Sequence, residues 1–131
     1  MTTTIYLLRY GEVHNPEGII YGRLPGYWLN EVGRGQVRTA GEFLAERGPF
    51  DALITSPLER ARESAGIIAE RLGLTPAVEP RLAETDVSGY QGQPFSALAA
   101  PGPHRGGCAR HGECRIDAGA DARLGRRRQV V

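Results

Sequence analysis

The chain has 131 residues and a formal net charge of +1, which suits a single domain with a hydrophobic core and excludes a strongly basic or acidic binding protein. It contains no apolar run of membrane-spanning length, and its N-terminus lacks a signal-peptide pattern. Its two cysteines give no disulfide framework. We therefore expect a cytoplasmic protein with no membrane partner.

The first expected elements are a strand and a long loop. Residues 4–9 predict a buried strand, because their apolar run is short and continuous. Residues 11–29 have no helical period and are rich in glycine, proline and aromatic residues, which predicts a loop over the end of that strand. Its aromatic residues are expected either to wall a pocket or to pack against the sheet; they are Tyr21, Tyr27 and Trp28.

The next elements alternate between helix and strand. A helix is expected from a cap at Asn30 to about Arg47, followed by a strand at residues 52–55. A second helix is expected to open with Ser56 as its cap, Pro57 at its first position and Glu59 completing a capping box, and to end at Gly73. A third strand is expected at residues 77–79. This order favours an α/β domain with a parallel sheet and right-handed crossovers, whose sites lie at the carboxyl ends of the strands.

The composition changes near residue 99, which divides the chain into a domain at 1–98 and a tail at 99–131. The tail has few large apolar residues and no amphipathic period, so we expect it to be disordered or loosely packed and to add no strand. Its abundance of arginine, glycine and alanine also fits a shifted reading frame in GC-rich DNA. Its arginines could attract nucleic acid, but the rest of the chain is acidic and carries no nucleic-acid motif, so we expect no nucleic-acid partner.

Four tail residues have side chains that can bind zinc, namely His104, Cys108, His111 and Cys114. Their spacing is not that of a standard zinc finger, and a tail of this composition gives such clusters easily. We therefore expect no metal site.

Two arginines follow predicted strands, where a phosphate site is expected. Arg9 ends the first strand, and Arg60 lies in the first turn of the second helix. Their guanidinium groups could converge on one phosphate, because they match its geometry and the helix N-terminus adds partial positive charge. Gly11 would let the backbone approach the anion closely. The alternative is that both arginines are solvated at the surface.

Four segments, in order, resemble motifs of the histidine phosphatase superfamily, the phosphoglycerate-mutase-like group. They are Leu7-Leu8-Arg9-Tyr10-Gly11-Glu12, Leu29-Asn30-Glu31-Val32-Gly33-Arg34-Gly35-Gln36, Ser56-Pro57-Leu58-Glu59-Arg60-Ala61, and Leu82-Ala83-Glu84 with Gly89-Tyr90-Gln91-Gly92. The resemblance implies a three-layer α/β fold, with a mostly parallel sheet and helices on both faces. It also implies that this fold is truncated here, with the C-terminal half missing or replaced.

The resemblance further implies phosphomonoester hydrolysis or phosphoryl transfer on a small phosphorylated substrate, without a cofactor. Phosphate would be bound by Arg9, Gly11, Asn15 and Arg60, and Glu84 would protonate the leaving oxygen. The alternative for Glu84 is a solvated loop carboxylate.

Tyr10 stands where the family has its nucleophilic histidine. A phenol with a pKa near 10 is almost entirely protonated at neutral pH, so catalysis is expected to be impaired. Tyr10 is then either a poor nucleophile or an aromatic residue that fills the pocket, and an engineered substitution would give the same sequence. The family's second His-Gly dipeptide is matched by His111-Gly112 only as a dipeptide, because no apolar strand precedes it.

Three functions therefore stay open. The chain is an impaired phosphomonoesterase, a non-catalytic phosphate-binding or interaction module, or a fragment without a function of its own. The sequence identifies neither the substrate nor the oligomeric state.

Overall fold

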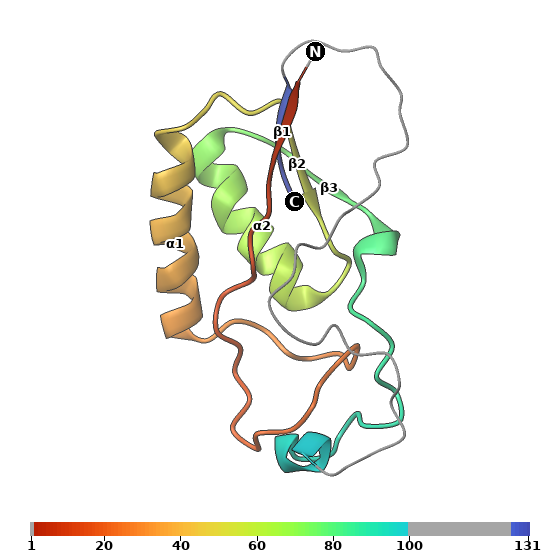
Figure 1. The fold of residues 1–131 in the computed structure, drawn as a ribbon. Coiled ribbons are helices and arrows are strands. Elements are labelled where there is room, and N and C mark those ends of the chain that lie inside the picture. Colours follow the sequence, from red (N-terminus) through yellow and green to blue (C-terminus); the bar gives the residue numbers. More distant parts are fainter. Residues whose placement is uncertain (1, 100–126) are drawn as a thin grey trace.

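The computed structural model describes residues 2–99 and 127–131. Within these ranges, four parallel strands form one sheet in the order β1-β4-β2-β3. The strands are β1 (Thr3–Tyr6), β2 (Ala52–Thr55), β3 (Pro76–Val78) and β4 (Arg127–Val130). The helices are α1 (Glu31–Ala45) and α2 (Glu59–Leu72), with short 3-10 helices η1 (Pro80–Leu82) and η2 (Phe95–Ala99) (Figure 1). The predicted α/β fold with a parallel sheet is confirmed.

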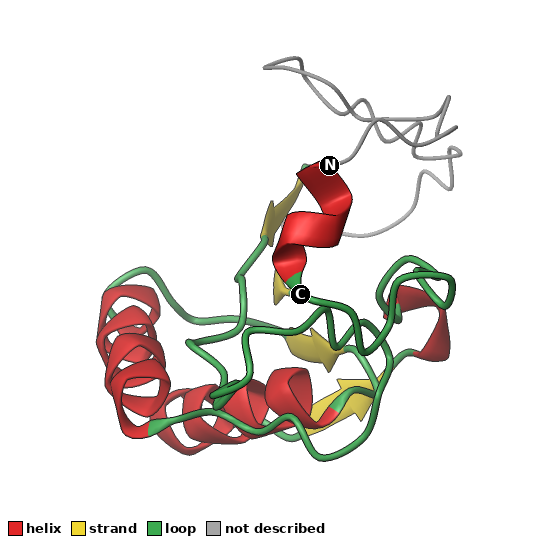
Figure 2. Ribbon diagram, turned by 90° about the horizontal axis from the view of Figure 1, so that it is seen from below, coloured by secondary structure: helices red, strands yellow, loops and turns green. Residues whose placement is uncertain are grey.

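Both α-helices lie on the same face of the sheet (Figures 1 and 2). Helix α2 packs on β2 and β3, and α1 packs on α2. The cause is topological, because the crossovers from β1 to β2 and from β2 to β3 step along the sheet in the same direction. Right-handed crossovers in one direction place their helices on one face. The expectation of helices on both faces is therefore wrong for the described part of the chain.

The hydrophobic core lies between the helices and the sheet. It consists of Leu29, Val37, Leu44, Phe50, Leu53, Ile68 and Val130. The ring of Tyr6 extends the core by meeting the ring of Phe50 edge-on, with 5.2 Å between centroids. The other residues of β1 are exposed, and Ile5 is 56% exposed. The prediction of a buried first strand is wrong, because among the described strands β1 is at the edge of the sheet with one face uncovered.

Strand β4 comes from the tail that was expected to add no strand. It lies between β1 and β2, with Ile5 beside Gln129 and Leu53 beside Val130. Val130 is 1% exposed, so this short segment completes the core from the centre of the sheet. The expectation of a strandless tail is wrong at this point. The predicted division at residues 98 and 99 falls inside η2 and stays a prediction.

The helix ends show where local sequence signals decide the structure. Helix α1 begins as predicted, with the Asn30 side chain accepting a hydrogen bond from the Gly33 N–H at 2.8 Å. Helix α2 ends as predicted at Gly73, whose φ of 67° is left-handed. Its start differs, because Leu58 occupies the cap position and makes no side-chain hydrogen bond. The predicted cap at Ser56 is therefore wrong.

The long connection between β1 and α1 is the predicted loop. Val13 forms an isolated bridge with Leu29, and Ile19 forms one with Pro94. The loop is thereby joined at one end to the start of α1 and at its tip to the segment before η2. Within the described ranges, no helix has the length and apolar character needed to cross a membrane.

Gly11 and Gly33 set how closely this loop approaches α1. A Cβ atom at Gly33 would collide with the backbone of Glu12, and a Cβ atom at Gly11 would collide with the carbonyl group of Gly33. Asn30 strengthens the contact, because its backbone N–H donates to the Glu12 carbonyl oxygen at 3.0 Å. The segment after β1 therefore contacts the first turn of α1 directly. This contact requires glycine at positions 11 and 33, because a Cβ atom at either would collide with the opposite backbone.

We predict that Gly33→Ala lowers the free energy of unfolding by about 2–3 kcal/mol, because the loop backbone must move away from the helix. Gly35→Ala is the matched control on the same helix, since a Cβ atom at Gly35 meets nothing within 4 Å. It should stabilise the chain by about 0.5–1 kcal/mol through helix propensity. Urea unfolding measures both, and equal effects would contradict the close contact.

Candidate functional site

A cavity of about 560 Å³ opens at the carboxyl ends of the strands. Four residues proposed from the sequence line it: Arg9 and Tyr10 from the segment after β1, Arg60 from the first turn of α2, and Glu84 from the segment after η1. Parallel strands with their crossovers bring such segments to one edge of the sheet. The cavity therefore brings together four side chains that are up to 75 positions apart in sequence, from Arg9 to Glu84.

Arg60 is the most deeply buried of these residues, with 1% of its surface exposed. Its Nη2 donates a hydrogen bond to the Gly22 carbonyl oxygen at 2.8 Å and lies 3.9 Å from Glu84 Oε2. Its Nε and Nη1 have no hydrogen-bond partner among the described residues. Because a buried charge with incomplete hydrogen bonding is costly, this guanidinium group is chemically suited to accept an anion.

Two tyrosine rings flank the Arg60 guanidinium group. Its central carbon lies 4.9 Å from the ring centroid of Tyr10 and 4.7 Å from that of Tyr21. These are cation–π distances, and they supply part of the stabilisation that the buried charge lacks from hydrogen bonds. The two phenol oxygens are 3.4 Å apart. Tyr10 therefore sits against the arginine at the position where the family resemblance expects a nucleophile.

Arg9 and Glu84 form the more accessible part of the cavity wall. Arg9 is exposed, and its guanidinium carbon is 5.8 Å from the ring centroid of Tyr10. The side chain of Glu84 is 43% exposed. Its backbone carbonyl oxygen accepts a hydrogen bond from Arg23 Nε at 2.6 Å, so the long loop holds this segment beside the cavity.

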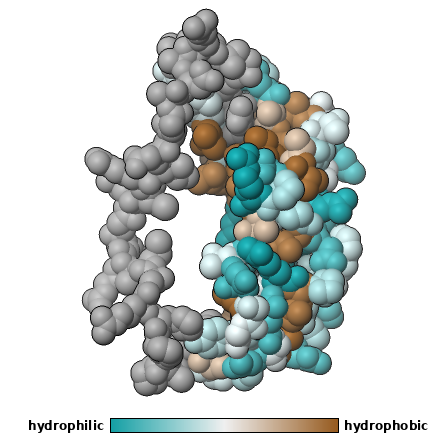
Figure 3. Space-filling view, turned by 90° about the vertical axis from the view of Figure 1, so that its right-hand side faces the viewer, coloured by the Kyte–Doolittle hydropathy of each residue, from teal (hydrophilic) through white to brown (hydrophobic). Residues whose placement is uncertain are grey.

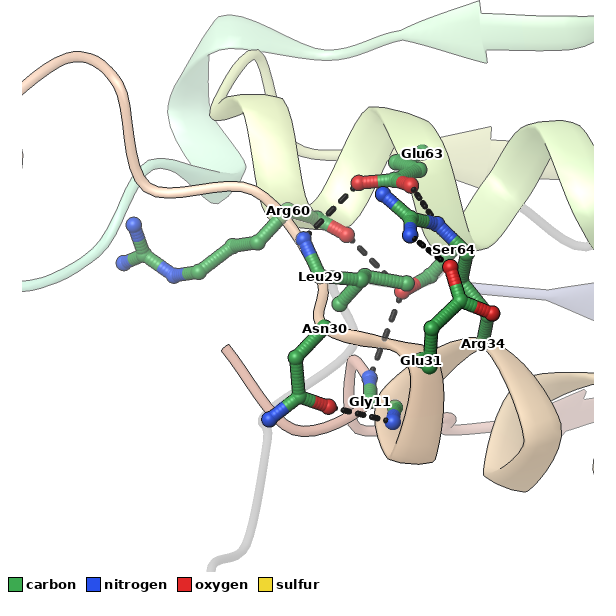
Figure 4. Close-up of polar contacts among 9 residues, drawn as sticks. Gly11, Leu29, Asn30, Glu31, Arg34, Arg60, Glu63 and Ser64 are labelled. Carbon is green, nitrogen blue, oxygen red and sulfur yellow. Dashed lines mark hydrogen bonds and ion pairs between the residues drawn. The ribbon is translucent and has the colours of Figure 1, made fainter. Parts of the chain in front are cut away.

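Ser64 connects the segment after β1 to α2 (Figure 4). Its buried hydroxyl accepts a hydrogen bond from the Gly11 N–H at 3.3 Å and donates one to the Arg60 carbonyl oxygen at 2.8 Å. In Figure 4 the guanidinium group of Arg60 points away from this junction. Ser64 therefore fixes the backbone of Tyr10 and Gly11 relative to the backbone of Arg60, while the arginine side chain extends elsewhere.

Asn15 does not line this cavity. Its Nδ2 donates to the Ile19 carbonyl oxygen at 2.9 Å, and its Oδ1 accepts from the Ile19 N–H at 3.2 Å. It lines a second cavity of about 380 Å³, together with Arg9, Tyr10 and Gly11. The side-chain amide of Asn15 thus forms hydrogen bonds within its own loop. Gly11 makes the close contact with Gly33 of α1.

The aromatic residues of the loop have different surroundings. Tyr21 contacts Arg60 and stacks on Tyr27, with 4.9 Å between centroids and 24° between planes. Trp28 is 48% exposed and lines neither cavity. Sequence reasoning missed Ser64 and Arg23. Ser64 lies four positions after Arg60 on the buried face of α2, and this spacing could have identified it as a neighbour of Arg60. No local sequence signal indicates that Arg23 lies near the site.

Burial changes the acidity of one phenol in the site. It raises the pKa of Tyr21 to about 12, and the hydrogen bond with Tyr10 acts in the same direction. Arg60 and Arg9 oppose this rise through their positive charges. Tyr21 therefore stays protonated at neutral pH and can share a hydrogen bond with Tyr10.

No group of three or more potential metal ligands occurs among the residues that the structure describes. The four zinc candidates of the tail, including His111, lie outside those residues. The site is therefore built from arginine, tyrosine and glutamate side chains.

Comparison with known proteins places this arrangement in a family. The model of the histidine phosphatase superfamily (branch 1) matches residues 5–128. An uncharacterized protein of Mycobacterium tuberculosis is 46% identical over 83 residues, which cover 63% of this chain and 41% of that protein. Glucosyl-3-phosphoglycerate phosphatase of the same organism is 34% identical over 100 residues, which cover 76% of this chain and 44% of the relative.

A solved structure is similar as well. The complex of mycobacterial glucosyl-3-phosphoglycerate phosphatase with inorganic phosphate matches with a TM-score of 0.62 and 34% identity, covering 74% of this chain and 44% of that one. This chain therefore spans less than half the length of these relatives.

Fold and site together define an α/β domain with a cavity, lined by two arginines, at the carboxyl edge of a parallel sheet. Because the family model covers most of its length, the chain belongs to the histidine phosphatase superfamily, branch 1.

We predict that Tyr21 ionises near pH 12 in an ultraviolet absorption titration, and that Tyr21→Phe removes this step. An unfolded phenol ionises near pH 10, so folding favours the protonated form of Tyr21. The free energy of unfolding should therefore fall as the pH rises from about 10 to about 12. If Tyr21→Phe removes a phenol that ionises near pH 10, the described environment of Tyr21 is wrong.

Proposed function

We propose that this chain binds phosphate monoesters in the cavity beside Arg60 and that its phosphatase activity is impaired. The observation that carries the proposal is the buried guanidinium group of Arg60, with two nitrogens that have no partner among the described residues. A phosphate offers oxygens to both, and charge-assisted hydrogen bonds of this kind are strong. Arg9, on the same cavity wall, supplies a second positive charge.

The relatives support phosphate as the ligand. One relative is glucosyl-3-phosphoglycerate phosphatase, and a solved structure of the mycobacterial enzyme is a complex with inorganic phosphate. The N-terminus of α2 next to Arg60 adds a partial positive charge that favours an anion. Phosphate is therefore the simplest probe of the site.

The proposed reaction uses the residues that line the cavity. The Tyr10 phenol would give up its proton to solvent as its oxygen attacks phosphorus, the bond to the ester oxygen would break, and Glu84 would give that oxygen its proton. Water would then hydrolyse the phosphotyrosine and release phosphate. The roles of Tyr10 and Glu84 rest on the family resemblance and on their position in the cavity.

Two properties of Tyr10 make this reaction slow. Its phenol is a weak nucleophile while it keeps its proton. Its ring also lies only 4.9 Å from the Arg60 guanidinium carbon, in space that a bound phosphate would need. A non-catalytic phosphate-binding module is the second candidate function, and the absence of the family's nucleophilic histidine at position 10 favours it.

Arg60→Gln tests the binding site. Loss of the charge and its free donors should weaken the binding of inorganic phosphate by about 10- to 100-fold in isothermal titration calorimetry. Arg62→Gln is the matched control, because Arg62 is exposed one half-turn further along α2 and lines neither cavity. Equal affinities for the two variants would refute the proposed site.

Tyr10→His tests the cause of the impairment. It should raise the hydrolysis of an aryl phosphate on the order of 100-fold or more, because imidazole is a neutral nucleophile at pH 7. Tyr10→Phe separates the two roles of the phenol, since it abolishes any remaining activity only if the Tyr10 oxygen attacks phosphorus. Phosphate binding without activity in the unmodified chain and in Tyr10→His would instead support the binding module.

A further inference from the structure

The cavity is larger than an anion site alone requires. Its volume of about 560 Å³ lies within the range of about 300–1,000 Å³ that is typical of small-molecule pockets. Tyr10 and Glu84 accompany Arg60 in one part of it, as the distances above show. Space therefore remains for the organic group of a phosphate ester.

The walls around that space are mainly apolar. Large aliphatic side chains line them from β2, from the strand ends and from η1: Leu7, Ile54, Leu58, Leu82 and Val131. Two of these remain accessible, because Leu7 is 74% and Leu82 is 40% exposed. Figure 3 looks at the side of the molecule away from the helices and shows apolar residues gathered on it. Exposed apolar surface beside a pocket is typical of a ligand-binding groove.

Several polar groups of the wall are already occupied. Thr55 Oγ1 donates to the Ser56 carbonyl oxygen at 3.2 Å, and Ser56 Oγ accepts from the Leu58 N–H at 3.4 Å. The hydroxyl of Ser64 has both of its hydrogen bonds within the protein. Along the aliphatic part of the wall a sugar would lose hydration of its hydroxyl groups without hydrogen bonds in exchange, whereas an apolar group loses nothing.

We infer that the ligand class of this site is an amphipathic phosphate monoester, whose organic group is an alkyl chain or an aromatic ring. The phosphate lies on Arg60, and the organic group lies along Leu7, Ile54 and Leu82. This inference rests on the proposed function and specifies its ligand. The inferred ligand class differs from a phosphorylated sugar in its apolar organic group.

Isothermal titration calorimetry of the whole chain tests the inference, with inorganic phosphate, methyl, butyl and hexyl phosphate, phenyl phosphate and glucose phosphate as probes. Alkyl phosphates are kept below the concentrations at which they form micelles. Each methylene group that becomes buried should raise the affinity by about three- to fourfold. Phenyl phosphate should bind more tightly than inorganic phosphate, and glucose phosphate should not.

Substitutions at the exposed wall locate the organic group. Leu7→Asn and Leu82→Asn should each flatten the dependence on chain length while leaving the affinity for inorganic phosphate unchanged. Val32→Asn is the control, because Val32 is a 57% exposed aliphatic residue on α1 that lines neither cavity. Because all three positions are exposed, none of these substitutions should unfold the chain.

Two results would overturn the inference while leaving the proposed function intact. One is an affinity that does not depend on chain length, although inorganic phosphate binds and Arg60→Gln weakens it. The other is a length dependence that Leu7→Asn and Leu82→Asn do not alter, which places the alkyl chain elsewhere. Absence of phosphate binding in the unmodified chain would reject the proposed function and this inference with it.

Discussion

The buried guanidinium group of Arg60 is the constraint on which the site depends. A buried charge costs several kcal/mol unless its partners compensate it. Here the compensation is incomplete, since Nη2 has partners but Nε and Nη1 have none among the described residues. The rings of Tyr10 and Tyr21 supply cation–π energy, on the order of 1–2 kcal/mol at a desolvated site. The surrounding structure therefore leaves Arg60 with two donors that, in the proposed function, an anion takes.

A short series of contacts in the fold positions the residues around Arg60. The Gly11–Gly33 contact seats the segment after β1 on the start of α1. Ser64 then ties the same segment to the backbone of Arg60, one turn earlier on α2. The long loop closes the site from the other side, because Gly22 binds Arg60 and Arg23 holds Glu84. The packing of two helices on one sheet face thus positions the residues of the proposed anion site.

Local signals in the sequence predicted local structure well. The Asn30 cap, the Gly73 stop and the long loop all depend on residues within a few positions of one another. Apart from the Ser56 cap, the failures concern non-local structure. The burial of β1 depends on its place in the sheet, and the strand at Arg127–Val130 depends on pairing with segments far earlier in the chain. Of the candidate site residues, four line one cavity, namely Arg9, Tyr10, Arg60 and Glu84, whereas Gly11 and Asn15 line only the second cavity.

We propose that an anion takes the free donors of Arg60, and a nuclear magnetic resonance titration of the arginine side chains tests this binding. In spectra of guanidinium Nε–H groups, addition of inorganic phosphate should shift the Arg60 signal progressively to saturation. Arg60→Gln assigns that signal by removing it. If phosphate leaves the Arg60 Nε–H signal unchanged at saturating concentration, the buried arginine does not bind the anion and the account is contradicted.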